Sequence, residues 1–245
     1  MRKRQYTALA KNNMEDDFGT DVSALWRSFM PFVDTIEKNK DETQNVSIMG
    51  IIHLDLPYPV IHNLVVTCQL QLSSRPVDLQ YVYKSLPNAF YDRSRFAATT
   101  IRSSNPVSTA LLFSSGKVVL TGAKGFKESC LAALQISILL QKYLAVQCQV
   151  IDAVVQNVVA HVECCPPQNG KRRKTLNIIK FYEEHSPYCT FQKNLFPGLI
   201  FRPPESPIVL LCFNSGRCVI TGGKNEADIL FGFCKLWSTV KSYIE

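Results

Sequence analysis

Residues 95–125 read RFAATTIRSSNPVSTALLFSSGKVVLTGAKG, and residues 195–225 read LFPGLIFRPPESPIVLLCFNSGRCVITGGKN. Aligned without a gap at an offset of 100, the two stretches are identical at 10 of 31 positions. The agreement continues upstream, where HNLVVTC (62–68) resembles QNVVAHV (156–162) and brings Asn63 into register with Asn157. This internal repeat predicts two copies of one structural unit, at 56–147 and 148–245, preceded by an N-terminal extension of residues 1–55.

Each copy is predicted to form several strands and one long closing helix. Phe113-Ser-Ser-Gly-Lys117 and Phe213-Asn-Ser-Gly-Arg217 have the composition of hairpin turns, in which glycine supplies the positive φ that the turn requires. Apolar residues recur at helical spacing in 126–144 and 226–244, which predicts amphipathic helices. The predicted strands are 64–70, 96–102, 107–113 and 117–121 in the first copy and 158–163, 196–202, 207–213 and 217–221 in the second. This layout indicates an α+β fold with helices on one face of an antiparallel sheet.

The other face of each predicted sheet has no evident cover. Side chains alternate along a strand, so Val118 and Leu120 share the face that can pack on the helix, whereas Val119 and Thr121 point the other way with Leu111 of the neighbouring strand. An apolar face rimmed by Lys and Arg is typical of a binding surface. The alternative is a sandwich in which a second layer of the chain covers that face.

The charge distribution is compatible with a polyanionic partner but does not by itself require one. Residues 1–55 hold seven Lys/Arg and nine Asp/Glu, a net charge of −2, and residues 56–245 hold 20 and 11, a net charge of +9. A face of Val, Leu and Thr suits the DNA minor groove, which offers few hydrogen-bonding groups, and basic residues at the rim would meet phosphates. Phenylalanine is a suitable wedge between base steps, and each copy has two, spaced 17 residues apart: Phe96 and Phe113, and Phe196 and Phe213.

At these residues the chain resembles the TATA-box-binding protein family. The resemblance covers about residues 58–245 and rests on RFAA, ALLFSSGKVVLTGAK, LFPGLIFR, and VLLCFNSGR followed by ITGGK. It implies a saddle of two pseudo-symmetric repeats, in which a curved ten-stranded antiparallel sheet binds DNA and helices cover the convex face. Minor-groove binding and kinking of DNA come with the resemblance.

The resemblance also implies roles for individual residues. The wedges would be Phe96 and Phe113 at one end of the DNA site and Phe196 and Phe213 at the other. The implied minor-groove residues are Asn63, Val65, Leu111, Val119, Thr121, Asn157, Val159, Pro197, Leu211, Val219 and Thr221. The residues expected to approach phosphates are Arg95, Arg102, Lys117, Arg202 and Arg217.

The implied function is that of a nuclear general transcription factor that binds and bends A·T-rich, TATA-like promoter DNA and nucleates assembly of the initiation complex. The implied partners are transcription factors IIA and IIB, TATA-binding-protein-associated factors and, in the absence of DNA, a second copy of the chain. No membrane partner is expected, because no apolar run approaches the ~20 residues that span a bilayer.

The chain departs from the family pattern at three places. The segment 131–142 (LAALQISILLQK) has one basic residue where the family has several, and the segment 191–195 (FQKNL) lacks the glutamates that meet transcription factor IIB in the family. The second copy is also longer before its first phenylalanine and carries a basic loop at 166–174. These departures favour a divergent or specialised paralogue. The divergent extension 1–55 is expected to be a partly flexible tail. The alternatives are that 22–38 forms a partner-binding helix or a helix that folds back over the concave face when DNA is absent.

Two other functions stay open on the sequence. An enzyme is disfavoured because the four histidines show no metal-ligand spacing and no phosphate loop or nucleophile motif is present. No catalytic residue, metal or cofactor is therefore expected, and Cys164-Cys165 with His161 is only a weak metal candidate. The second alternative is a protein-interaction module that kept the fold and lost or altered DNA binding. The presence of all four phenylalanines argues against it.

Overall fold

The structure is a computed structural model that describes residues 56–245 apart from 73–75, 146, 168–173 and 205. The segment 22–38 and most of the basic loop at 166–174 lie outside the described residues. The described chain forms two compact units: a first unit, Leu64–Gln156, and a second unit that combines residues 56–63 with Asn157–Glu245. No helix in this part of the chain is long and apolar enough to cross a membrane.

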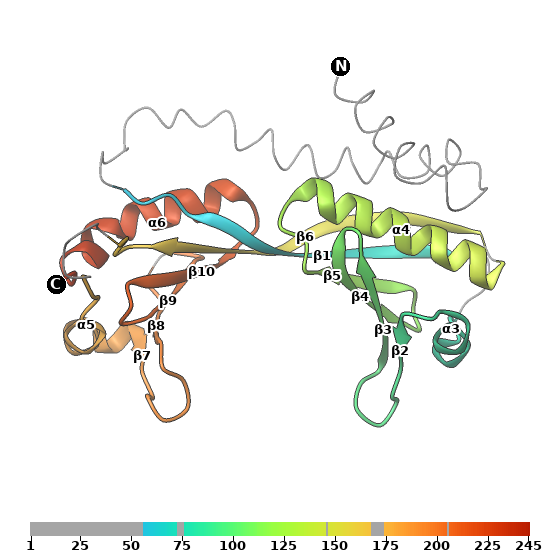
Figure 1. Cartoon of the computed structure of the whole chain (residues 1–245), viewed down its shortest axis with the longest axis horizontal. Coiled ribbons are helices and arrows are strands. Elements are labelled where there is room, and N and C mark those ends of the chain that lie inside the picture. The colour runs from blue at the N-terminus through green and yellow to red at the C-terminus, as the bar shows by residue number, and fades with distance from the viewer. Residues whose placement is uncertain (1–55, 73–75, 146, 168–173, 205) are drawn as a thin grey trace, which may run out of the picture. The chain divides into compact units, whose positions relative to one another are not determined.

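Both units are built from the same series of strands and helices (Figure 1). The first series is β1 (Val60–Leu72), α3 (Leu79–Ser85), β2 (Ala89–Phe90), β3 (Ala98–Ser104), β4 (Val107–Phe113), β5 (Lys117–Thr121) and α4 (Phe126–Leu144). The second series is β6 (Cys148–Glu163), α5 (Ile178–His185), a 3-10 turn η2 (Ser186–Tyr188), β7 (Cys189–Thr190), β8 (Leu199–Phe201), β9 (Val209–Cys212), β10 (Arg217–Gly223) and α6 (Glu226–Lys241). Strands β1 and β6 each contribute to both units.

The strands belong to one ten-stranded sheet in the order β2-β3-β4-β5-β1-β6-β10-β9-β8-β7. Pairing within each unit is antiparallel, and the register repeats between them. Leu111 of β4 lies opposite Val119 of β5, as Leu211 of β9 lies opposite Val219 of β10. The duplication read from the sequence therefore extends to the pairing of individual residues.

The two predicted hairpin turns are confirmed. The N–H of Gly116 donates to the carbonyl oxygen of Phe113 at 2.9 Å, and the N–H of Gly216 donates to that of Phe213 at 2.9 Å. The two glycines have φ values of 82° and 84°, in the left-handed region that favours glycine. Each turn begins at a phenylalanine, which is the last residue of β4 in the first unit and directly follows β9 in the second.

The predicted division of each sheet into two faces is also present. Val118 and Leu120 are only 1% and 2% exposed, whereas Val119 and Thr121 between and beside them are half-buried. Helix α4 packs against β4 and β5, and α6 packs against β10 (Figure 1). Burying apolar side chains under a helix stabilises one face of each sheet and leaves the alternate side chains on the other.

Several elements differ from the sequence expectation. Strand β6 begins at Cys148, ten residues before the predicted start at 158. Asp152 within this strand has a φ of 52°, so the side-chain alternation is interrupted there and the early part of the strand is not evident in the sequence pattern. The short strands β2 and β7 and the helices α3 and α5 were not predicted individually. Helix α6 ends at Lys241, three residues before the predicted end.

Candidate nucleic-acid interface

The face of the first unit that is turned away from α4 carries rows of half-buried side chains; we call it the first open face. One row crosses four strands and consists of Thr100, Leu111, Val119 and Thr67, which lie opposite one another in register. All four side chains are half-buried. Directly opposite residues on one face of a sheet have adjacent side chains, so the row forms a continuous, mostly apolar strip.

The second open face has the same construction. Its matching row consists of Ile200, Leu211, Val219 and His161, again directly opposite one another and again half-buried. At three of the four equivalent positions, the two rows carry the same residue or another small or apolar residue. The exception is His161, which occupies the position that Thr67 has in the first unit.

Each open face ends in a pair of phenylalanine rings. The ring centroids of Phe96 and Phe113 are 6.0 Å apart with an interplanar angle of 65°. The centroids of Phe196 and Phe213 are 5.7 Å apart at 67°. Phe96 is 48% exposed, and the other three rings are half-buried. The sequence predicted these rings as two pairs, one in each copy, and both pairs have nearly the same edge-to-face geometry.

The first ring of each pair lies on a loop that projects from the sheet on the side away from the long helix (Figure 1). In the first unit the backbone N–H of Phe96 donates to the carbonyl oxygen of Asp92 at 3.0 Å. The Asp92 carboxylate accepts hydrogen bonds from the hydroxyl and the N–H of Ser94, which lower the pKa of Asp92. In the second unit the N–H of Phe196 donates to the carbonyl oxygen of Gln192 at 2.9 Å. Local backbone hydrogen bonds therefore hold the backbone at both loop phenylalanines, Phe96 and Phe196.

Gly198 lets the second pair pack closely. A Cβ atom at this position would lie 2.6 Å from Cε1 of Phe196 and 2.9 Å from Cε1 of Phe213. The repeat-equivalent position in the first unit is Ala98, which lies opposite Phe113 in register. The two phenylalanine pairs thus have similar geometry but a different neighbour.

The predicted polar residue of the second open face is held in a fixed orientation. Oδ1 of Asn157 accepts from the backbone N–H of Gly222 at 2.9 Å, and Nδ2 of Asn157 donates to Oγ1 of Thr221 at 2.9 Å. This arrangement keeps the amide group, which can donate to acceptors, on the open face beside Thr221. The repeat-equivalent residues Asn63 and Thr121 are likewise half-buried.

The remaining predicted groove residues are also accessible. Pro197 is exposed beside Phe196, and Val65 and Val159 are half-buried on their strands. None of the predicted groove residues is fully buried: Asn63, Val65, Leu111, Val119 and Thr121 in the first half of the chain, and Asn157, Val159, Pro197, Leu211, Val219 and Thr221 in the second.

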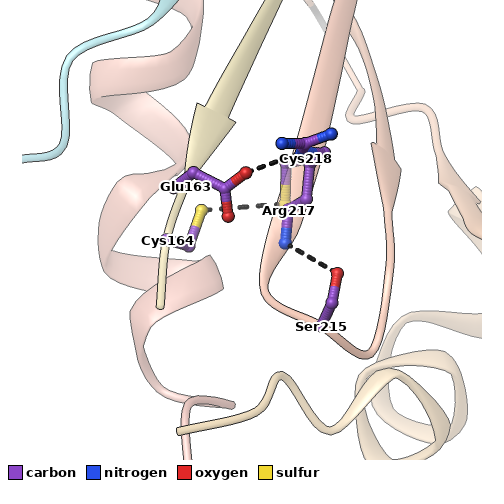
Figure 2. Close-up of polar contacts among 5 residues, drawn as sticks. All are labelled: Glu163, Cys164, Ser215, Arg217 and Cys218. Carbon is purple, nitrogen blue, oxygen red and sulfur yellow. Dashed lines mark hydrogen bonds and ion pairs between the residues drawn. The ribbon is translucent and has the colours of Figure 1, made fainter. Parts of the chain in front are cut away.

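The five predicted phosphate-contacting cations are exposed but not equally available. Arg102, Lys117 and Arg202 are exposed, and none of them forms a resolved ion pair within the described residues. Nε of Arg95 lies 3.4 Å from Oδ2 of Asp92. Nε of Arg217 lies 2.6 Å from Oε1 of Glu163, with its backbone N–H near Oγ of Ser215 (Figure 2). Arg217 must loosen this contact to meet a phosphate, whereas Lys117, opposite Gln69, has no carboxylate at the matching position.

The weak metal candidate at His161 is not supported. Cys164 and Cys165 are buried, and Sγ of Cys164 lies 3.7 Å from Sγ of the buried Cys218 (Figure 2). His161 instead lies in the half-buried row of the second open face, opposite Val219. The contact with the Cys218 thiol, and then burial, raise the pKa of Cys164. Across the described residues, no group of three His, Cys, Asp or Glu side chains is arranged to hold a metal ion.

Sequence reasoning missed several residues of the open faces. Thr67, Thr100 and Ile200 complete the two rows, and Gly198 lies against the second phenylalanine pair. His161, in contrast, was expected on the groove face from the sequence, and the strand register confirms that it lies opposite Val219. The signal that could have found Thr67 is the upstream repeat, in which Asn63 aligns with Asn157 and hence Thr67 with His161.

Two matching sheet faces, each ending in a pair of phenylalanine rings, are the features expected from the sequence for a duplicated protein of the α+β class. The chain matches the family "Transcription factor TFIID (or TATA-binding protein, TBP)" over residues 58–143 and 152–243. It therefore belongs to the TATA-binding protein family, whose members are transcription factors and not enzymes.

Individual relatives agree with the family match. The chain is 37% identical to the TATA-box-binding protein of Caenorhabditis elegans over 190 residues, which are 78% of this chain and 52% of the relative. It is 36% identical to the TATA box-binding protein-like 2 of Takifugu rubripes over 76% of this chain and 54% of the relative. The chain thus spans about half the length of these relatives.

The fold comparison confirms the expected fold class. The structure of the Methanococcus jannaschii TBP matches with a TM-score of 0.60 and 30% sequence identity, covering 76% of this chain and 99% of the archaeal chain. The α+β class, the two repeats and the ten-stranded antiparallel sheet predicted from the sequence are confirmed.

Proposed function

We propose that this protein binds the minor groove of A·T-rich promoter DNA with its two open faces and bends the duplex, and that it acts in the nucleus to begin assembly of a transcription initiation complex. The observation that carries the proposal is the pair of phenylalanine pairs, with ring separations of 6.0 and 5.7 Å, at the ends of two matching apolar strips. Family membership supports it.

The chemistry of the open faces suits this target. Leu111, Val119, Leu211 and Val219 supply apolar contact to a groove that offers few hydrogen-bonding groups. The Asn157 amide can donate to the acceptors that A·T and T·A pairs share there. Rings that insert between base steps unstack them and kink the duplex, and the cations at the rim then reach the phosphates of the bent DNA.

Bending measured with permuted A·T-rich duplexes tests the proposal. We expect the wild-type protein to form a bent complex, and Phe96→Ala or Phe213→Ala to weaken binding by about tenfold or more and to reduce the bend. Tyr143→Ala is the matched control, because Tyr143 is an exposed aromatic residue on α4 and not on an open face. Binding to A·T-rich and G·C-rich duplexes with equal affinity and no bend would reject the proposal.

The alternative function, a protein-interaction module with altered DNA binding, predicts a different result in the same assay. Such a module would keep its folded structure and fail to bend DNA, and the phenylalanine variants would then match the wild type. The similarity to a TATA box-binding protein-like 2 is compatible with either outcome.

Partners of the general transcription machinery form part of the proposal. We expect the loop between β7 and β8 to recognise a factor IIB-like partner differently from the family, since Gln192, Lys193 and Asn194 are exposed there and none is acidic. A pull-down with factors IIA and IIB, compared between wild type and Lys193→Glu, measures this. Stronger IIB capture by the variant is the expected result, and unchanged capture would show that the loop does not contact IIB.

A further inference from the structure

The two open faces differ at one pair of polar positions that the repeat makes equivalent. In the first unit Nε2 of Gln156 donates to Oγ1 of Thr67 at 2.7 Å. In the second unit the rings of His62 and His161 make an edge-to-face contact, with centroids 5.5 Å apart and an interplanar angle of 86°. Gln156 and His62 each precede the paired asparagine of their repeat, so the two contacts occupy the same place in the two units.

Both contacts lie on the open faces. Thr67 is directly opposite Val119, and His161 is directly opposite Val219, so each shares a row with the residues proposed to enter the groove. His62 is exposed and its ring touches that of His161, which places both rings beside the apolar strip. A base pair that lies next to Val119 therefore meets a different protein surface from a base pair that lies next to Val219.

We propose that the His62–His161 pair makes the second open face reject a G·C base pair that the first open face tolerates, and so fixes which way round the protein sits on its site. This inference rests on the proposed function. The difference between G·C and A·T pairs in the minor groove is the exocyclic amino group of guanine, which projects from the groove floor. The two packed imidazole rings beside Val219 are bulkier and more rigid than the Thr67 side chain and the flexible Gln156 amide beside Val119.

The first unit also has a chemical route to accept the amino group. The Gln156 amide bears a carbonyl oxygen, an acceptor, on a flexible side chain. The rings of His62 and His161 are stiffer, with two rotatable side-chain bonds each, and they pack on each other. Shape and side-chain flexibility thus both favour the guanine amino group at the first open face and both disfavour it at the second.

Affinities for three duplexes test the inference without any measurement of orientation. The first is a self-complementary A·T site, the second carries one G·C pair in one half, and the third carries the symmetric G·C pair in both halves. If the faces differ, the protein turns to place the first G·C pair on its tolerant first unit, so this pair lowers affinity by about twofold. The second pair then has to meet the His62–His161 pair and lowers affinity by about tenfold more.

Two reciprocal double variants provide matched controls. H62Q/H161T gives the second unit the polar pair of the first, and we expect both steps to become small and equal. T67H/Q156H gives the first unit the histidine pair, and we expect both steps to become large. Replacing each guanine by inosine, which lacks the amino group, is expected to remove the large step from the wild type. Thermal unfolding of each variant checks that it is folded.

The outcomes separate this inference from the proposed function. Failure to bind the uninterrupted A·T duplex rejects the proposed function. Binding to that duplex with two equal steps in the wild type overturns only the role of the histidines. The same holds if unequal steps persist in H62Q/H161T, or if inosine and guanine give the same step.

Discussion

The first and second units keep the same apolar architecture and differ in the groups around it. Leu111 and Val119 have the same register as Leu211 and Val219, and both phenylalanine pairs have nearly the same geometry. Three pairs of equivalent positions differ. Beside the phenylalanine pairs, the first unit has Ala98 and the second has Gly198. At the rim, the first unit has Gln69 opposite Lys117 and the second has the ion pair of Glu163 and Arg217, and on the open face the Gln156–Thr67 hydrogen bond corresponds to the His62–His161 ring contact. Apolar strips that shape a groove contact are thus preserved, while the residues that tune its fit and charge have diverged. The two units are alike as a scaffold and unequal as binding surfaces.

The largest expected effect is on the free energy of unfolding and concerns two repeat-equivalent glycines, Gly122 directly after β5 and Gly222 within β10. Gly122 and Gly222 have φ values of 96° and 97°, but a Cβ atom at Gly222 would lie 2.3 Å from the carbonyl oxygen of Pro207, whereas one at Gly122 would come no closer than 3.3 Å to Ser108. We expect Gly222→Ala to lower the free energy of unfolding by about 3–4 kcal/mol, the sum of backbone strain and overpacking, and Gly122→Ala by about 1–2 kcal/mol from strain alone.

Urea unfolding of the two glycine variants measures this difference. Equal losses of stability in both would show that the closer contact at Gly222 relaxes without cost.

A smaller effect is expected at the position beside the phenylalanine pairs. Gly198→Ala places a methyl group against Phe196 and Phe213, so the rings must move apart. We expect DNA affinity to fall about tenfold, equivalent to about 1.4 kcal/mol. Ala98→Gly in the first unit, which removes a methyl group instead, is expected to change affinity by about twofold or less. Fluorescence anisotropy with an A·T-rich duplex measures both, and a neutral Gly198→Ala would mean that the geometry of the second pair is unimportant for binding.

The ion pair at the rim predicts a change in salt dependence. Glu163→Gln releases Arg217 to neutralise a phosphate, so the slope of log affinity against log salt should steepen by up to about 0.9. Gln69→Glu introduces a carboxylate opposite Lys117 in the first unit and should make the slope shallower. Titrations of affinity between low and moderate salt check both variants. Two unchanged slopes would remove Arg217 and Lys117 from the set of phosphate contacts.

The smallest expected effect concerns the buried thiols. Burial raises the pKa of Cys68 to about 12 and that of Cys148 to about 11 in the first unit, and the pKa of Cys218 is also raised in the second. Since the thiolate is the reactive form, we expect iodoacetamide at pH 8 to leave these cysteines unmodified in the folded protein, as read by mass spectrometry. Rapid alkylation of Cys68 or Cys148 would show that the first unit opens readily.

Much of this architecture could be predicted from the sequence because each turn, strand and long helix of the repeat occurs twice in the chain and could be compared between the two copies. The hairpins, the long helices and the two-faced strands follow from glycine position and alternation, as at Gly116 and Val118–Val119. The prediction for β6 was too short because Asp152 breaks the side-chain alternation within that strand. Strands β2 and β7 have only two residues each, which is too few for an alternating pattern.

The candidate site was less completely predictable. Membership of a row such as Thr100–Leu111–Val119–Thr67 depends on strand register, which no local pattern specifies. The contact between His62 and His161 joins residues 99 positions apart in the chain, so it emerges only when β1 and β6 are placed side by side.

Base unstacking measured with 2-aminopurine tests the central claim, that the four phenylalanines wedge into DNA from two equivalent open faces. We predict that its fluorescence rises at two separate steps of an A·T-rich duplex when the protein binds, and that F96A/F113A and F196A/F213A each remove about half of the rise summed over the two steps, whichever way round the protein binds. Tight binding with no rise at either step would contradict the account.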